Sequence, residues 1–378
     1  MLRTSIRRVA TISKEAQVFN AAENLSKLLE TGDRSSYILA QYIPQPAKHT
    51  FLAIRAFNLE INKINDGGNN ANSVSSKAAS LLSSSLGFST VDMKFKFWSD
   101  MLGRIFSDPN SPKNDNLGEP IAILLREGLR DDLNLDISYF HQFLQTRRHF
   151  LQTKQFQSVD DICSYGEGTY SQLNYLVQGL LLSPLISPSV INLLECSPNL
   201  QNLITDIAAH IGQATAIGSM ILGVPYYSKL RNQITLPIEL MTQFDISQEQ
   251  LLRLTQGHIT DKQAQKQIQD QLKNVVYETA TKANDHLLTA RMKFDNVRQE
   301  INTIIKENPN DHLIQKQYKN WKKGVPDVIF TPFMSAIPTT LYLQALERND
   351  FDLFHPKLQQ KEWRLPYYSF KDYYFRKF

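Results

Sequence analysis

The chain has 378 residues, of which 42% are hydrophobic and 21% charged, so its composition is that of an ordinary folded protein. A net charge of +4 is too small to indicate nucleic-acid binding. The only cysteines, Cys163 and Cys196, form no C-x-x-C pair, which argues against a disulfide-stabilised scaffold and a thiolate zinc site. This cysteine usage is typical of a reducing compartment.

The N-terminal segment is basic and has no acidic residue before Glu15. Leu2, Ile6 and Val9 recur at helical spacing among four basic residues, so a helix here would be apolar on one side and basic on the other. This pattern predicts a mitochondrial transit peptide over residues 1–18, and the alternative is a frayed basic tail. The basic residues are Arg3, Arg7, Arg8 and Lys14.

Apolar residues recur three and four positions apart through most of the remaining chain, which predicts helices. No alternation typical of strands occurs, so the predicted fold class is all-α, with a single helical domain over residues 19–350. Segments 66–90 and 107–119 are predicted to be flexible or loops, and 302–323 to be exposed and polar. The predicted helices cover residues 16–29, 33–43, 48–64, 93–106, 120–129, 137–153, 159–182, 206–222, 247–254, 261–298 and 332–349.

Three features of these helices give specific expectations. Ala208, Gly212 and Ala216 lie four residues apart on one face, so a second helix should approach closely there. Pro225 is expected to end its helix, and Pro338 to kink the last one. The most apolar run, 176–186, is shorter than the ~20 residues that a membrane span needs. No other stretch qualifies, so membrane association is expected to be peripheral.

Common catalytic motifs are absent from the sequence. It contains no G-x-x-x-x-G-K-[ST] or G-x-G-x-x-G phosphate loop, no H-E-x-x-H metal motif and no G-x-S-x-G nucleophile turn. No nucleotide, metal or other cofactor is therefore expected, and no hydrolase activity.

Four runs follow one another along the chain: Phe51–Asn62, Lys94–Trp98, Tyr165–Tyr175 and Ile211–Ala214. In this order they resemble the squalene/phytoene synthase superfamily. A second set of runs consists of Arg55–Glu60, His210–Gln213, Gly223–Tyr227 and Phe351–Lys361. These are more similar still to a mitochondrial branch, the complex I assembly factor 6 family.

The resemblance implies a single isoprenoid-synthase-like helical bundle with a central cavity. Enzymes of the superfamily join two prenyl diphosphates and hold Mg²⁺ with two D-x-x-x-D boxes. Here the first box falls on Asn62 and Asp66, and the second on Gly223 and Tyr227. Three of the four expected carboxylates are missing, and a single aspartate would bind Mg²⁺ weakly.

Five residues are candidates for lining the cavity that the resemblance implies. They are polar or aromatic residues on predicted helices, and the alternative for each is a structural role within or between helices. The candidates are Arg55, Asn58, Glu60, Tyr170 and Gln213.

The resemblance therefore implies a non-catalytic assembly factor for respiratory complex I, acting early in membrane-arm biogenesis. Two alternatives stay open: a prenyl- or lipid-binding protein and a residual prenyl-diphosphate transferase. The expected partners are complex I subunits or other assembly factors, with a possible lipid in the cavity. The expected location is the matrix side of the mitochondrial inner membrane.

The last segment, 351–378, combines aromatic residues with lysine and arginine. Such a composition suits a membrane interface or a partner surface. It suits equally a tail that packs on the bundle and closes it.

Overall fold

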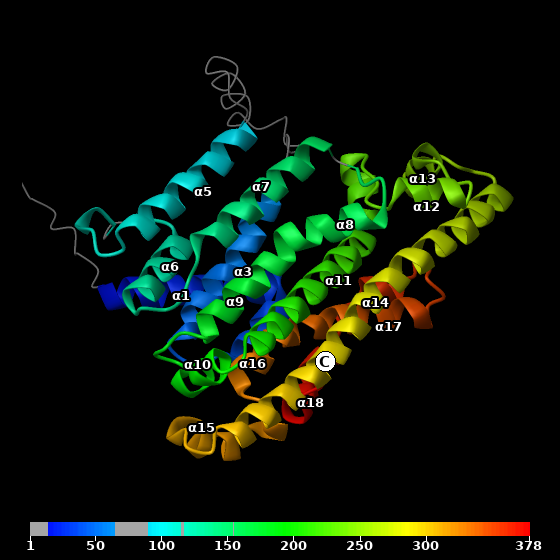
Figure 1. Cartoon of the computed structure of the whole chain (residues 1–378). Coiled ribbons are helices and arrows are strands. Elements are labelled where there is room, and N and C mark those ends of the chain that lie inside the picture. Colours follow the sequence, from blue (N-terminus) through cyan, green and yellow to red (C-terminus); the bar gives the residue numbers. More distant parts are fainter. Residues whose placement is uncertain (1–13, 65–89, 115–116, 154) are drawn as a thin grey trace, which may run out of the picture.

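A computed structural model of the chain describes residues 14–64, 90–114, 117–153 and 155–378. These residues form a helical bundle that contains no strand, which confirms the predicted fold class (Figure 1). The α-helices are α1 (Lys14–Gly32), α2 (Arg34–Leu39), α3 (Ala47–Lys63), α5 (Thr90–Ser107), α6 (Pro120–Arg130), α7 (Ile137–Thr153), α8 (Val159–Gly166), α9 (Gln172–Leu181), α10 (Pro188–Glu195), α11 (Pro198–Arg231), α12 (Ile238–Gln243), α13 (Gln248–Thr255), α14 (Lys262–Glu307), α15 (His312–Gln317), α16 (Asp327–Phe330), α17 (Ala336–Arg348) and α18 (Leu365–Phe375).

Helix starts follow the local chemistry of the sequence. Asp33 caps α2 by accepting a hydrogen bond from the Ser36 amide, and Ser158 begins α8 with a capping box closed by Asp161. At the N-terminus, α1 already begins at Lys14, and Val18 packs against the core. Residues 14–18, which were assigned to the transit peptide, are therefore helical here because Val18 has apolar surface to contact; residues 1–13 lie outside the described part.

The two longest helices, α11 and α14, lie side by side through the bundle (Figure 1). The buried residues of α11 include several alanines and glycines, among them Ala208, Gly212 and Ala216. Those of α14 are mostly branched aliphatic side chains and alanines, with one aromatic residue, Phe294. The helix α14 is longer than expected and continues to Glu307, because Ile301 and Ile304 are both buried. The segment expected to be polar and exposed therefore begins inside a core helix.

Pro225 does not end α11, contrary to the expectation from the sequence. The helix continues to Arg231, where Asn232 closes it in the left-handed conformation. Five residues before the proline, the Met220 carbonyl accepts a hydrogen bond from the Thr235 hydroxyl at 2.7 Å. The extensive packing of α11 against α14 also supports the helix. Pro338 lies in the first turn of α17. The change from 3₁₀ to α-helix, between η6 (Thr331–Ser335) and α17, therefore comes before this proline.

The length of α11 also changes the membrane prediction. Among the described residues, α11 is the one helix long and apolar enough to cross a membrane by length and composition. The expectation that no stretch qualifies was therefore wrong, because α11 begins at Pro198, eight residues before the predicted helix 206–222. Most of the apolar window is nevertheless buried inside the bundle, as expected for a core helix.

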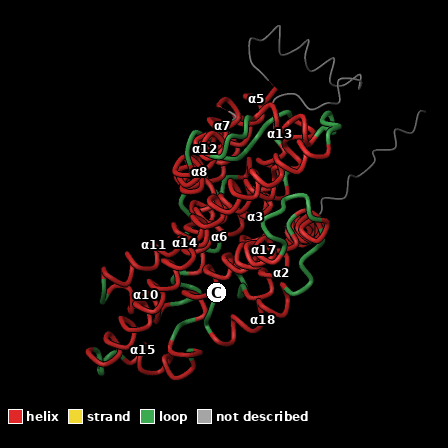
Figure 2. The backbone as a smooth tube through the Cα atoms, turned by 90° about the vertical axis from the view of Figure 1, so that its right-hand side faces the viewer, coloured by secondary structure: helices red, strands yellow, loops and turns green. Residues whose placement is uncertain are grey.

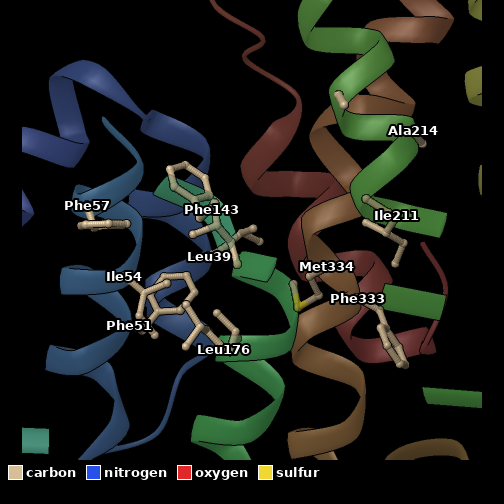
Figure 3. Packing of buried hydrophobic residues seen from close by; sticks show 14 of the residues in the cluster. Leu39, Phe51, Ile54, Phe57, Phe143, Leu176, Ile211, Ala214, Phe333 and Met334 are labelled. Atoms are coloured by element: carbon tan, nitrogen blue, oxygen red, sulfur yellow. The ribbon is translucent and has the colours of Figure 1, made fainter. Parts of the chain in front are cut away.

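The hydrophobic core joins helices from both halves of the chain (Figure 3). Phe51, Ile54 and Phe57 from α3 face Phe143 of α7 and Leu176 of α9, and Met334 of η6 lies between these helices and α11. The ring of Phe57 packs edge-on against Trp98 and Phe140 at about 5 Å between ring centroids. Figure 2 shows, from the side, that the described part of the chain consists of helices joined by loops.

Candidate functional site

A five-residue π-helical segment, η3 (Glu167–Ser171), interrupts the long predicted helix 159–182 and separates α8 from α9. Its neighbour is the small-residue face of α11. A Cβ atom added to Gly212 would lie 2.2 Å from the Ser171 hydroxyl oxygen, and one added to Gly166 would lie 2.8 Å from the Ala216 Cβ. The predicted close approach at Gly212 and Ala216 is confirmed, and π-helical turns of this kind are frequent at functional sites.

Arg147 of α7 lies next to this contact and is only 2% exposed. Its guanidinium Nη1 donates a hydrogen bond to the Tyr165 hydroxyl at 2.7 Å and sits 5.6 Å from the centre of the Phe150 ring. Its Nε has no hydrogen-bond partner, and among the described residues no carboxylate forms an ion pair with it. A buried cation without a carboxylate is costly, so this group favours an anion or a developing negative charge.

Tyrosines surround the Arg147 guanidinium. Tyr165, Tyr170 and Tyr227 each interact with it electrostatically, from α8, η3 and α11. Burial raises the pKa of both Tyr165 and Tyr170, so these phenols remain neutral at physiological pH and act as hydrogen-bonding groups. Tyr170 is also hydrogen-bonded to Ser219 of α11. We refer to Arg147, Tyr165, Tyr170 and Tyr227 as the arginine–tyrosine cluster.

The two positions matched to the second aspartate box lie beside this cluster. A Cβ atom on Gly223 would meet the Tyr227 ring at 2.7 Å, so the ring lies directly over the glycine. Magnesium prefers several carboxylate oxygens, whereas these positions offer no side chain and a phenol, with a guanidinium nearby. The residues at these two positions do not fit a magnesium ion.

The positions matched to the first box give less information. Asn62 donates its amide hydrogen to the Asn58 side-chain oxygen at 3.1 Å, and Asn58 is buried. Beside them, Glu60 forms a short ion pair with Lys63. Asp66 lies outside the described residues.

The structure distributes the five candidate lining residues over separate places. Arg55 binds Ser36 at 2.6 Å and Asp33 at 3.4 Å, which ties α3 to the start of α2. Gln213 donates to the Glu167 carboxylate at 3.2 Å. Tyr170 alone belongs to the arginine–tyrosine cluster, and Asn58 and Glu60 lie near the first-box position. None of the five lines the cavities described next.

The largest of the described cavities, about 580 Å³, opens between α7 and α8. Phe150, Phe156 and Tyr165 form its apolar wall, with Gln145 and Asp161 among the polar lining residues. Two of these lining residues, Tyr165 and Phe150, also contact the Arg147 guanidinium, which does not itself line the cavity. A smaller groove of about 390 Å³ runs along the C-terminal half of α11.

A second polar group joins α8, α11 and α14. His210 and His286 approach each other at 3.0 Å between their Nδ1 atoms, and His286 Nε2 lies 3.4 Å from the Cys163 sulfur. Burial is the main cause that lowers the pKa of both histidines, and burial raises the pKa of the Cys163 thiol to about 11. These shifts favour the neutral forms of His210, His286 and Cys163, so the three side chains form a structural hydrogen-bonded chain. Among the described residues no group of three or more His, Cys, Asp and Glu side chains could hold a metal ion.

Sequence reasoning did not select Arg147, although one signal was present. Arg147 lies on the apolar stripe of α7 formed by Phe140, Leu144 and Leu151, where a charged residue is unusual. The neighbouring Arg148 is exposed and pairs with Asp92, and the sequence alone does not show which of the two arginines is buried. The burial of Arg147 depends on Tyr165, which comes from another helix.

Comparisons with known proteins agree with this architecture. The mouse protein named NADH dehydrogenase (ubiquinone) complex I, assembly factor 6 is 28% identical over 90% of this chain and 78% of its own length. The human protein of that name is 26% identical over 91% and 79%. The expected resemblance to this branch is confirmed.

Two solved structures share the fold at low sequence identity. A dehydrosqualene synthase in complex with ligand superposes with a TM-score of 0.57 at 14% identity, covering 96% of this chain and 98% of its own. The squalene synthase HpnC from Alicyclobacillus acidocaldarius gives 0.56 at 11% identity, covering 89% and 96%. The family model for squalene/phytoene synthase matches residues 29–365, and the chain therefore belongs to the squalene/phytoene synthase family.

Proposed function

We propose that this protein is a non-catalytic assembly factor for respiratory complex I that keeps an isoprenoid-synthase fold. The observation that carries the proposal is the similarity, over about nine-tenths of the chain, to proteins named complex I assembly factor 6. Its partners would be complex I subunits or other assembly factors, and it would act early in the building of the membrane arm.

The same proposal includes a location in the mitochondrion, on the matrix side of the inner membrane. The basic, acid-free N-terminus supports import, with residues 1–18 as the transit peptide or its greater part. Residues 19–350 would form the helical domain and 351–378 its C-terminal tail. Burial of α11 in the bundle supports peripheral association rather than a span.

Deleting the gene in the organism of origin tests this proposal. We expect native gel electrophoresis to show loss of assembled complex I and accumulation of partial membrane-arm assemblies, while the other respiratory complexes persist. Re-expression of the whole chain should restore the complex I band. An unchanged amount of complex I in the deletion strain would contradict the proposal.

The absence of catalysis is supported by the arginine–tyrosine cluster. Leaving diphosphate carries negative charge that Mg²⁺ normally neutralises, and a metal needs carboxylates to be held. Gly223 and Tyr227 supply none, and Arg147 adds positive charge to the same region.

Purified protein incubated with farnesyl diphosphate or geranylgeranyl diphosphate and Mg²⁺ should release no diphosphate above the protein-free rate. Turnover that disappears in the Asp66→Ala variant would contradict this and favour a residual transferase. Ligand binding without turnover, detected as a raised melting temperature in the same samples, would instead support a lipid- or prenyl-binding protein. That second function is favoured by one observation, the unpartnered Nε of Arg147, whose guanidinium contacts two lining residues of the largest described cavity.

A further inference from the structure

Helix α18 carries aromatic side chains on its outer face. Tyr367, Phe370 and Tyr374 follow each other at three and four residues, which places them along one stripe of the helix. Trp363 lies in the turn just before α18 and is also exposed. Their exposed fractions are 78% for Trp363, 62% for Tyr367, 64% for Phe370 and 53% for Tyr374. We call these four residues the aromatic stripe.

The inner face of α18 fixes the direction in which the stripe points. Leu365, Ser369 and Arg376 are buried, each about half a helical turn away from the stripe. The Arg376 guanidinium pairs with Asp327 and donates to the Tyr373 carbonyl at 2.6 Å. Because these contacts anchor the inner face, the aromatic stripe cannot turn into the core without breaking them.

The charges around the stripe are predominantly positive. Lys361, Lys371 and Lys377 are exposed, and none forms an ion pair with any described residue. Of the acids in this segment, Glu362 is paired with Arg364 at 2.5 Å, and Asp372 is partly buried; burial raises its pKa to about 6, although the nearby Lys371, Arg291 and Lys377 act to lower it. The surface presented by α18 therefore combines four aromatic rings with unpaired lysines.

We propose that the outer face of α18 docks on the surface of an anionic lipid bilayer, with the helix lying in the plane of the membrane. This inference rests on the proposed peripheral membrane association and names the surface responsible. Tryptophan and tyrosine have an apolar ring and a polar edge, which suits the boundary between headgroups and acyl chains. Lysines beside them gain energy from the negative potential of anionic lipids.

The shape of the surface favours a bilayer over a folded protein partner. The aromatic stripe stands on the convex outer side of a single helix, and the cavities described above lie on other elements. Protein interfaces also use tyrosine and tryptophan but are depleted in lysine, so the lysines that flank these rings favour an anionic bilayer. Neutral side chains with a polar end have a small desolvation cost when they enter the headgroup region.

Flotation of the whole chain with phosphatidylcholine vesicles containing about 30% phosphatidylglycerol tests this proposal. All samples carry Arg3→Gln, Arg7→Gln and Arg8→Gln, so that the basic N-terminal segment contributes little to binding. Changing Trp363, Tyr367, Phe370 and Tyr374 to serine should lower the partition coefficient at least about tenfold. Changing Lys361, Lys371 and Lys377 to glutamine should lower it about fivefold per lysine, and only with anionic vesicles.

Helix α5 offers a matched control. It exposes Met93 and Phe97 beside Lys94 and Lys96, and it lies far from α18 in both Figure 1 and Figure 2. The variants Met93→Ser with Phe97→Ser, and Lys94→Gln with Lys96→Gln, should bind vesicles like the parent. Equal losses from the α5 and α18 variants would overturn the assignment to α18. Circular dichroism and thermal unfolding verify that every variant is folded.

Trp363 provides a readout specific to the proposed face, because the other two tryptophans, Trp98 and Trp321, are buried or half-buried. Brominated phosphatidylcholine in the vesicles should quench the fluorescence of the bound parent. The variant Trp363→Phe should still bind but lose most of the quenching. Persistent quenching in that variant, no vesicle binding by the parent, or a dimer in solution that the serine changes dissociate would each overturn the proposal. None of these results depends on whether complex I requires the protein.

Discussion

Replacing Gly212 by alanine should lower the free energy of unfolding by about 3 kcal/mol. The new methyl group would lie 2.2 Å from the Ser171 hydroxyl oxygen and 2.4 Å from the Ser171 backbone nitrogen. Two of the closest elements in the bundle, α11 and η3, would have to separate. A backbone atom cannot move aside as the end of a flexible side chain can, so the strain spreads along both elements. Urea unfolding monitored by circular dichroism measures the change.

Gly103 is the matched control for that substitution. It also lies inside a helix, α5, but a Cβ atom there would meet nothing within 4 Å. Gly103→Ala should therefore stabilise the protein by about 0.5 to 1 kcal/mol through helix propensity. Similar effects of the two substitutions would show that the close contact at Gly212 does not determine stability.

Changing Arg376 to glutamine should cost about 3 kcal/mol and release α18 from the bundle. The buried guanidinium pairs with Asp327, donates to the Tyr373 carbonyl, and lies 4.9 Å and 4.5 Å from the ring centres of Phe330 and Tyr373. Glutamine has neither the charge nor the planar fork that makes these contacts together. Thermal unfolding and limited proteolysis after residue 360 measure the effect.

Arg364, at the other end of α18, serves as the comparison. Its side chain pairs with Glu362, two residues away, at the partly exposed start of the helix. Arg364→Gln should cost less than about 1 kcal/mol, as for other solvent-accessible ion pairs. If Arg364→Gln proved as damaging as Arg376→Gln, the contacts of the buried Arg376 guanidinium would not be what holds the tail.

These contacts also show how the tail should be studied. Phe378 packs its ring against Phe294, Phe330 and Phe333, and Arg291 donates to its backbone carbonyl. Truncation of residues 363–378 would uncover this part of the core as well as remove the aromatic stripe. Substitutions on the outer face separate the two effects, because they leave the inner contacts in place.

Much of the helical pattern could be predicted from the sequence. Helix α7 has the predicted bounds, and α6 and α13 differ from theirs by about one residue, because apolar periodicity is strong when one face of a helix is buried. The small-residue face of α11 likewise predicted a close approach by another helix, although not that η3 and α8 would make it. These features depend on residues near one another in the chain.

Other features depend on contacts between distant segments and could not be read from local patterns. The Met220 carbonyl accepts an additional hydrogen bond from the Thr235 hydroxyl, and packing against α14 supports α11. No sequence periodicity distinguishes the π-helical turn of η3 from the α-helices on either side of it. Arg147 is buried because Tyr165 and residues of α11 surround it. Sequence periodicity shows which face of a helix is buried, but it does not identify the residues that pack against that face.

The pairing of α11 with α14 has a consequence for biosynthesis. The apolar helix is completed at Arg231, whereas the helix that covers it begins at Lys262 and ends at Glu307. While the ribosome, or later an import channel, delivers the second helix, α11 can pack on α8, η3 and α9, which precede it, but the face that α14 covers stays open. We therefore expect a truncation before Lys262 to leave that face exposed and prone to aggregation.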